Sequence, residues 1–258
     1  GFEKTLTRAI TDVYGHVLIA NRTSTPQKLE NIIGRVRAVV PEAETFTPFL
    51  NVEAVIAHAV KGQSNSLSGV LIQGVDPVSV HEVLNVKTRV IRGEFNIVDD
   101  GNIPRALIGK GLARRFDIKV GEHFRVVLPS PQAESSTGFQ PKVQEFILSG
   151  VLDLGKKEYD DRYILTSLKS AQKFAGTKDK FSGIRVRLDD HTKAPSAALR
   201  LAREFGGSYW IGDWTEVEAN LFEAIALEKP VIFFIIMIII IAAAFNISSQ
   251  LFVNVLQR

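Results

Sequence analysis

A long uncharged stretch near the C-terminal end constrains this chain more than any other feature of its sequence. No Asp, Glu, Lys or Arg occurs between Val231 and Gln257, and every residue from Val231 to Phe245 is apolar. A transmembrane helix needs roughly 20 predominantly apolar residues, and buried core helices rarely run this long without a charge. The seven isoleucines of the run together favour insertion into a bilayer by about 3 kcal/mol. Residues 230–258 are therefore predicted to span a membrane, with Val231, Phe234, Ile238, Ala242 and Phe245 among the side chains inside it.

A helical stalk is predicted directly before this span. Asp213 and Glu216 have the spacing of a capping box at a helix N-terminus, although Asp replaces the usual Ser or Thr. No helix-breaking residue follows until Pro230, so a helix over residues 214–229 would rise about 24 Å and kink near the membrane surface. Residues 1–11 have the pattern of a helix end. We therefore expect a large segment held between two membrane helices, the first of which precedes this chain.

The composition and the motifs exclude several kinds of site. The 258 residues include no Cys, which excludes disulfides, thiolate metal sites and cysteine nucleophiles. The formal net charge of +3 is too small to indicate nucleic-acid binding. The G-x-x-x-x-G-K-[ST] loop that binds nucleotide phosphates is absent, and Gly109–Lys110–Gly111 is better explained as the boundary of a helix. The five histidines are scattered, and the three Asp–Asp pairs fit turns better than calcium loops. We expect no catalytic residue, no metal and no cofactor in this chain.

The remaining sequence begins with a strand–helix–strand pattern. A buried strand is followed by a helix that has Ser24 or Thr25 as its cap and Pro26 at its first position, where a missing N–H has no cost. An extended stretch over residues 43–61 comes next and is interrupted at Pro48.

The same pattern returns at the other end of this part. Residues 183–188 alternate apolar and basic side chains, as expected for a half-exposed strand. Pro195 then opens a helix, and a short strand follows it. Because the two patterns are alike, we expect residues 12–76 and 181–213 to form one α+β subdomain built from both ends, with the middle of the chain inserted.

The middle of the chain, residues 77–180, is predicted to be an inserted β-rich subdomain. Strands are expected at residues 106–108, 123–128, 143–154 and 163–165, and helices over 110–116 and after Ser167. Residues 129–142, PSPQAESSTGFQPK, are polar and contain three prolines and a glycine, which indicates a long loop. The prediction is therefore an α+β fold, in which a two-part domain is followed by a stalk and a transmembrane helix.

Basic residues are concentrated directly before this loop. Between Arg105 and Arg125, six basic residues stand against Asp117 and Glu122, which gives a local net charge of +4. Two interpretations stay open, a solvated helix face and a docking surface for an acidic protein. The other basic residues of the segment are Lys110, Arg114, Arg115 and Lys119.

Several stretches of the chain resemble the lipoprotein-releasing ABC transporter permeases, the Lol family. They are SGVLIQGVDP (68–77), ALIGKGLARRFDIKVGE (106–122), KEYDD (157–161), FSGIRVRLDD (181–190) and DWTEVEANLFEAIALEKPVIFFIIMIIIIAAAFNISSQL (213–251). The resemblance covers essentially the whole chain and preserves its order. It implies a periplasmic domain between the first two membrane helices, with a membrane-proximal part made from both ends and an inserted β-rich part.

The resemblance also implies a function and a set of partners. Two permease subunits, as a homodimer or a heterodimer, pair with a dimer of a cytoplasmic ATPase, so this chain is not itself an enzyme and ATP is bound by the partner. ATP hydrolysis drives extraction of lipoproteins from the bacterial inner membrane, and the cargo passes to a soluble periplasmic carrier. The full-length protein would cross the membrane several times, residues 1–229 would be mostly periplasmic, and the stalk would transmit the motion, a mechanotransmission.

In the carrier-recruiting permeases of this family, a protruding loop called the hook and a nearby polar pad bind the carrier. Residues 129–142 match the hook in position and length, and Arg125 matches a basic residue of the pad. The family has a proline and a bulky apolar residue at the tip of the hook, where this chain has Ser136 and Thr137, and Gln–Arg where it has Val143 and Gln144. The resemblance implies these carrier-binding residues: Arg125, Pro129, Ser136, Thr137, Gly138, Phe139, Pro141, Lys142 and Gln144.

Three other functions stay open at this point. The first is a macrolide-exporter-like permease of the same architecture that works with an outer-membrane channel. The second is a cell-division-type permease homologue that activates a cell-wall hydrolase through its periplasmic domain. The third is a single-pass sensor domain, which would be followed by a cytoplasmic output domain. The hook-like loop favours lipoprotein release.

Overall fold

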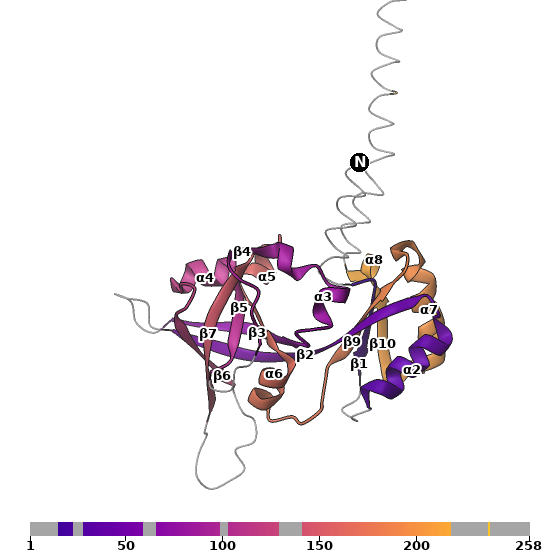
Figure 1. Cartoon of the computed structure of the whole chain (residues 1–258), viewed down its shortest axis with the longest axis horizontal. Helices are drawn as coiled ribbons and strands as arrows, with labels where there is room; N and C mark the ends of the chain where they lie inside the picture. Colours follow the sequence, from indigo (N-terminus) through magenta and orange to yellow (C-terminus); the bar gives the residue numbers. More distant parts are fainter. Residues whose placement is uncertain are drawn as a thin grey trace, which may run out of the picture. The chain divides into compact units, whose positions relative to one another are not determined.

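The computed structural model describes residues 15–22, 28–58, 66–98, 103–128, 141–217 and Met237 (Figure 1). The chain divides into two compact units, Gly1–Trp214 and Thr215–Arg258. The predicted membrane span lies in the second unit and, except for Met237, outside the described residues. Within the described part, no helix is long and apolar enough to cross a membrane. The predicted span and stalk therefore stay predictions.

The first unit contains a mixed sheet, and the α+β fold class expected from the sequence is confirmed (Figure 1). Its strands are β1 (Val17–Asn21), β2 (Ala43–His58), β3 (Ser66–Val75), β4 (Val90–Gly93), β5 (Arg105–Gly109), β6 (His123–Leu128), β7 (Lys142–Leu152), β8 (Tyr163–Ser167), β9 (Gly183–Leu188) and β10 (Tyr209–Asp213). Its helices are α2 (Leu29–Val39), α3 (Val80–Val83), α4 (Lys110–Phe116), α5 (Lys157–Asp160), α6 (Leu168–Ala175) and α7 (Ala194–Phe205), and α8 (Trp214–Val217) begins at its last residue. The short 3-10 helices are η1 (Val86–Arg89), η2 (His191–Lys193) and η3 (Gly206–Ser208).

Strand β2 is shared by two differently built parts of the sheet. On one side the order is β10-β1-β9-β2, which we call the open sheet. On the other side β2 pairs with β3 and with β6, and the order β2-β3-β8-β5-β7-β6 closes on itself, which we call the barrel. Closure removes the strand edges that an open sheet leaves unpaired. With 16 residues, β2 is long enough to serve both parts.

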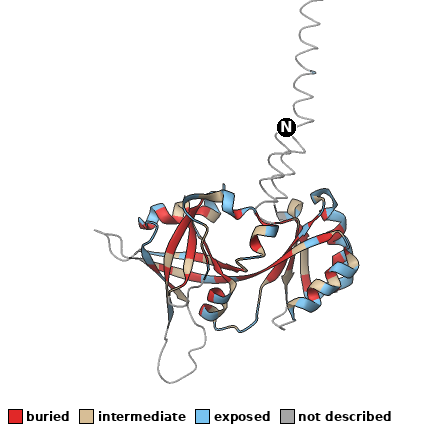
Figure 2. Ribbon diagram, in the orientation of Figure 1, coloured by how far each residue is buried: buried red, intermediate tan, exposed pale blue. Residues whose placement is uncertain are grey.

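Three hydrophobic cores match this arrangement (Figure 2). The open sheet packs against α2 and α7 around Ile19, Val36 and Leu201. The inside of the barrel is filled by aliphatic side chains together with phenylalanines, and the rings of Phe124 and Phe146 are stacked with their centres 5.7 Å apart. The third core lies under the segment from α3 to Ile97. The predicted division into residues 12–76 with 181–213 and residues 77–180 stays a prediction, and β2 and β3 supply side chains to the barrel core.

Local sequence signals located most elements well. Helix α4 has the predicted bounds, and Ser167 caps α6 by accepting a hydrogen bond from the backbone N–H of Ser170 at 3.1 Å. The start of the first helix was wrong: α2 begins at Leu29 because Lys28 has an extended backbone. The predicted cap residues Ser24 and Thr25 lie outside the described residues.

Two expectations about strands were also wrong. Pro48 does not interrupt β2, since it lies opposite Ile184 in a pairing with β9 that is continuous from Thr45 to Phe49. The carbonyl of Phe49 accepts from Ser182 beside β9, so the nitrogen of Pro48 points to the other edge, where pairing with β3 starts only at Phe49. A proline is tolerated where its nitrogen faces no partner strand. Strand β9 is not half-exposed, because Arg185 is buried.

The glycines around Lys110 are explained by a close approach of chains. A Cβ on Gly109 would lie 2.4 Å from the carbonyl oxygen of Asp160, and a Cβ on Gly111 would lie 1.9 Å from a carboxylate oxygen of Asp161. Lys110 between them pairs with Asp153 at 2.7 Å and with Asp160 at 3.4 Å. The two glycines therefore leave the space that α5 needs to pack against the start of α4, and Lys110 holds it there through Asp160.

Gly109→Ala should lower the free energy of unfolding by about 2 kcal/mol, because its new methyl group has no space against backbone atoms of α5. Gly34→Ala is the matched control, since nothing lies within 4 Å of a Cβ at that position of α2. The control should raise stability by about 0.5–1 kcal/mol through helix propensity. Urea unfolding followed by circular dichroism measures both, and equal stability of Gly109→Ala and wild type would contradict the close approach.

His16, directly before β1, makes hydrogen bonds to the last residue of β9 and to the residue that follows β10. Its Nδ1 accepts a hydrogen bond from the backbone N–H of Leu188 at 3.0 Å, and its carbonyl accepts from the N–H of Trp214 at 3.2 Å. Burial lowers the pKa of His16 to about 4, and the charges of Arg187 and His191 act in the same direction. The ring is therefore neutral in the folded protein and keeps its acceptor.

Stability should fall when the pH is lowered from about 6.5 to 4. The unfolded chain takes up a proton at the ordinary histidine pKa of about 6.5, whereas folded His16 resists until about pH 4. For a fully buried group this difference would favour unfolding in acid by about 3 kcal/mol, and because His16 is only partly buried we expect about 2 kcal/mol in this window. His16→Asn, which retains an acceptor for Leu188, should flatten the dependence. Thermal unfolding at several pH values measures it, and the same slope in both proteins would exclude His16 as the cause.

Candidate partner-docking surface on strands β6 and β7

Strands β6 and β7 present the described part of the predicted carrier-binding site. They pair antiparallel from His123 with Ile147 to Leu128 with Lys142. Of the predicted site residues, Arg125, Pro141, Lys142 and Gln144 are described. The others lie outside the described residues: Pro129, Ser136, Thr137, Gly138 and Phe139.

An exposed charged group occupies the outer face of this pair of strands. Arg125 lies directly opposite Glu145, with its Nε 3.6 Å from the carboxylate Oε1. His123 places Nδ1 3.7 Å from the same oxygen. The Arg125 side chain is 68% exposed, so this pair contributes little to stability. Its guanidinium therefore stays available to an acidic group of a partner.

Two valines extend the outer face toward the loop. Val127 lies opposite Val143, and Val143 is 54% exposed. Side chains alternate between the two faces of a strand, so both valines share a face with Arg125 and Glu145. The face thus combines a small apolar patch with a charged pair, a composition that suits the rim of a protein interface.

Lys142 and Gln144 lie on the other face of β7. Lys142 directs its Nζ to the carbonyl oxygen of Lys173 in the last turn of α6, at 2.6 Å. A cation at this position interacts favourably with the helix dipole. Gln144 donates to the carbonyl oxygen of Glu145 at 2.9 Å. The structure therefore separates these two residues from Arg125.

The basic segment from Arg105 to Arg125 does not form one surface. Lys110 is held by Asp153 and Asp160, and hydrogen bonding to Asp153 raises the pKa of Lys110. Arg114 and Arg115 are exposed on α4, and Arg115 donates to the hydroxyl of Ser68 at 3.2 Å. Arg125 lies on β6, and its guanidinium pairs with Glu145, which His123 also approaches. Most of the +4 charge is therefore paired or lies away from the loop.

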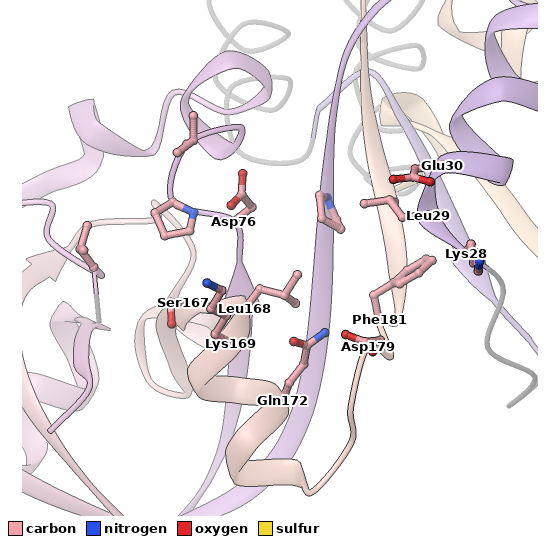
Figure 3. A pocket seen from close by; sticks show the side chains of 14 residues that line it. Lys28, Leu29, Glu30, Asp76, Ser167, Leu168, Lys169, Gln172, Asp179 and Phe181 are labelled. Atoms are coloured by element: carbon pink, nitrogen blue, oxygen red, sulfur yellow. The ribbon is translucent and has the colours of Figure 1, made fainter. Parts of the chain in front are cut away.

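A groove of about 840 Å³ is a second feature of the first unit (Figure 3). It lies on the face of β2 that carries Pro48, with Leu168 of α6 on one side and Leu29 and Phe181 on the other. Charges of both signs surround it, so it shows no preference for a cation or an anion. Across the described segments, no group of three acidic or histidine side chains is arranged to hold a metal ion.

Sequence reasoning missed Glu145, His123 and the outward position of Val143. The signal was present, because the alternation of faces that places Arg125 outward also places every second residue of β7 outward once the register is known. The register depends on the length of the loop and on contacts with the rest of the barrel. A single sequence does not supply these.

Comparison with known proteins identifies relatives over the whole chain. The lipoprotein-releasing system transmembrane protein LolC of Neisseria meningitidis serogroup B is 26% identical over 259 residues, covering 100% of this chain and 60% of LolC. LolC of Xylella fastidiosa strain 9a5c is 26% identical and covers 97% of this chain and 58% of its own length. The lipoprotein-releasing system transmembrane protein LolE of Haemophilus influenzae is 24% identical, covering 99% and 60%. The chain thus spans about 60% of the length of these relatives.

A solved structure shares the fold. The periplasmic region of MacB from Actinobacillus actinomycetemcomitans superimposes with a TM-score of 0.50 at 12% identity and covers 83% of this chain and 94% of that region. In sequence, a family model described as the MacB-like periplasmic core domain matches residues 1–204. The sheet-rich architecture and the extent of this match agree, and the chain belongs to the family of the MacB-like periplasmic core domain.

Proposed function

We propose that this chain is the periplasmic domain and second membrane helix of a permease subunit in an ABC transporter that extracts lipoproteins from the inner membrane. The observation that carries the proposal is the similarity to LolC and LolE over 97–100% of the chain, which includes the apolar stretch of residues 230–258. The names of these relatives describe them as transmembrane proteins of a lipoprotein-releasing system. A resemblance limited to the periplasmic fold would have ended near residue 204.

In this function the chain binds and transmits but does not hydrolyse ATP. It lacks a phosphate-binding loop, so a separate cytoplasmic ATPase supplies the energy. A second permease subunit of the same or a different type completes the transporter. The full-length protein crosses the inner membrane several times, and residues 1–229 are mostly periplasmic.

A topology test follows from this placement. The chain has no Cys, so single cysteines introduced at chosen sites give unambiguous labelling. Leu199→Cys on α7, where the side chain is 63% exposed, should react in intact cells with a maleimide that crosses the outer membrane but not the inner one. Labelling only after the inner membrane is opened would place the domain in the cytoplasm and contradict the proposal.

The carrier would dock on the outer face of β6 and β7, together with the loop of residues 129–141 that joins them; the predicted last loop residue, Lys142, is the first residue of β7. Arg125 offers an exposed cation, and Val143 beside it offers apolar area at the base of the loop. A loop of this length is longer than a hairpin needs, and its three prolines reduce the ordering entropy lost on binding. In the free protein the guanidinium of Arg125 pairs weakly with Glu145. On binding, this pair would be replaced by a pair between Arg125 and an acidic group of the carrier.

Arg125→Glu should weaken binding of a purified periplasmic lipoprotein carrier about tenfold, because it places two carboxylates opposite each other where the partner needs a cation. Arg114→Glu is the matched control, since it reverses an exposed arginine on α4, away from this face, and should leave the affinity unchanged. Biolayer interferometry with the immobilised chain measures both. Equal effects of the two substitutions would contradict a specific role of Arg125 and would indicate a general attraction between opposite charges.

Removing residues 131–140 should abolish carrier binding while the domain stays folded. The strands that flank the loop are held by their own pairing, from Val127 with Val143 to His123 with Ile147, and by the ring stack in the barrel core. Circular dichroism checks the fold, and the same binding assay checks the carrier. A folded deletion variant that captures the carrier with wild-type affinity would show that the loop is not the docking site.

The family match also supports a second candidate, a macrolide-exporter-like permease that works with an outer-membrane channel. The observation in its favour is the shared fold with the periplasmic region of MacB. Purification of the full-length permease after cross-linking in cells distinguishes the two candidates. Recovery of a small soluble carrier supports lipoprotein release, and recovery of an outer-membrane channel supports export.

A further inference from the structure

The open sheet and the barrel are joined through one strand. Between Ala43 and Phe49, β2 pairs with β9 of the open sheet, and from Phe49 onward it pairs with β3 of the barrel. On the edge that faces β9, strand pairing resumes only at Val55, with β6. In the described part of the chain, β2 is the one strand common to both ladders. A change in angle between the two parts would therefore concentrate near Phe49.

A buried polar network crosses this point on one face of the sheet, and Gln73 of β3 is its centre. The side-chain oxygen of Gln73 accepts a hydrogen bond from Nη1 of Arg185 on β9 at 2.8 Å, and also accepts from the hydroxyl of Tyr163 on β8. Its amide nitrogen donates to Oδ1 of Asn51 on β2 at 2.8 Å. One side chain thus connects the open sheet, the shared strand and the barrel.

The network is held in place by its surroundings. Gln73 is 3% exposed and Arg185 is 7% exposed. The guanidinium of Arg185 lies 4.7 Å from the centre of the Phe49 ring. Burial raises the pKa of Tyr163 to about 12, so its hydroxyl keeps the proton it donates. Removing one member of a buried polar network is costly, because its former partners then lack a hydrogen bond inside the protein.

The opposite face of the junction carries a close contact and, beside it, a groove. Helix α6 packs tightly against β3 at Gly74, where a Cβ would lie 2.4 Å from the Cβ of Ala171. The groove of about 840 Å³ opens on this face, with Pro48 of β2 in its lining. Leu168 comes from the barrel side of the groove, and Phe181 belongs to the segment that leads into the open sheet (Figure 3). There is space on this face for the two parts to move toward each other.

We propose that the junction is a latched hinge: β2 bends near Phe49, the groove gives the space for bending, and the hydrogen bonds of Gln73 hold the two parts at one angle. The hinge goes beyond the proposed function and does not depend on the substrate of the transporter. It lies between the two places that a transporter of this kind has to connect. Strand β10, which leads into α8, belongs to the open sheet, and β6 and β7 belong to the barrel.

Distances between two spin labels test the hinge directly. Leu199→Cys on α7 marks the open sheet, and Val120→Cys, 45% exposed after α4, marks the barrel. With both labels on the full chain in lipid nanodiscs, double electron–electron resonance should give one narrow distance distribution. Gln73→Met, which preserves size and removes all three hydrogen bonds, should broaden the distribution about twofold.

Two further variants test whether the broadening comes from the loss of hydrogen bonds at the junction. Tyr163→Phe removes one hydroxyl from the network and should broaden the distribution less than Gln73→Met does, and it decides the matter if Gln73→Met fails to fold by circular dichroism. Asn31→Leu removes an exposed amide from α2 and should leave the distribution narrow. Narrow distributions in folded Gln73→Met and Tyr163→Phe would overturn the latch. Equal broadening in Asn31→Leu would overturn it as well, since the effect would then be independent of the junction.

Discussion

The single backbone of strand β2 has to pair with strands of both the open sheet and the barrel, and this constraint organises the first unit. Each residue of a strand offers its N–H and C=O to one edge, and neighbouring residues alternate between edges. Where β9 ends and β3 begins, β2 changes its main partner, so no second strand reinforces it across the junction. The polar groups buried there must find partners in side chains instead. The backbone N–H of Asn51 in β2 donates to the hydroxyl of Ser182 at 2.9 Å. Gln73 adds three hydrogen bonds to side chains of β2, β8 and β9. Gly183 allows β1 to approach β9, since a Cβ there would lie 2.3 Å from the carbonyl oxygen of Ile19.

The sequence predicted elements where their determinants are local. Helix α4 and the Ser167 cap follow from residues within one turn, and the structure has both as expected. Pro48 and Arg185 were misread because their environment is set by distant segments. A proline in a strand is harmless only if its nitrogen faces no partner, and a basic residue in an alternating strand is exposed only if nothing covers that face. The segment from α3 to Ile97 covers the face of the sheet on which Arg185 lies, and the periodicity of β9 alone does not reveal this cover.

The candidate docking surface shows the same limit in its electrostatics. A net charge counted along the sequence treats the six basic residues of the segment as one patch. The fold places Lys110 between two carboxylates and sets Arg125 against Glu145, which leaves Arg114 and Arg115 as the exposed cations on α4. Charge at the base of the loop is therefore modest, and long-range attraction contributes less to binding than the sequence indicates. Specificity would then depend on short-range contacts, for which Val143 and the exposed guanidinium of Arg125 are well placed.

The hinge and the docking surface are connected through the barrel. Phe174 of α6 packs edge-on against Phe146 of β7 at 6.4 Å, and Lys142 at the start of β7 binds the carbonyl of Lys173 in the same helix. The other end of α6 lines the groove at the junction through Leu168. Helix α6 is thus in contact with the base of the loop at one end and with the space for bending at the other. A packed helix moves as a unit, because the close-packed interior around it does not compress. A change of angle at β2 would therefore reach β7 as a displacement of α6, and the orientation of the docking face would change with the state of the junction.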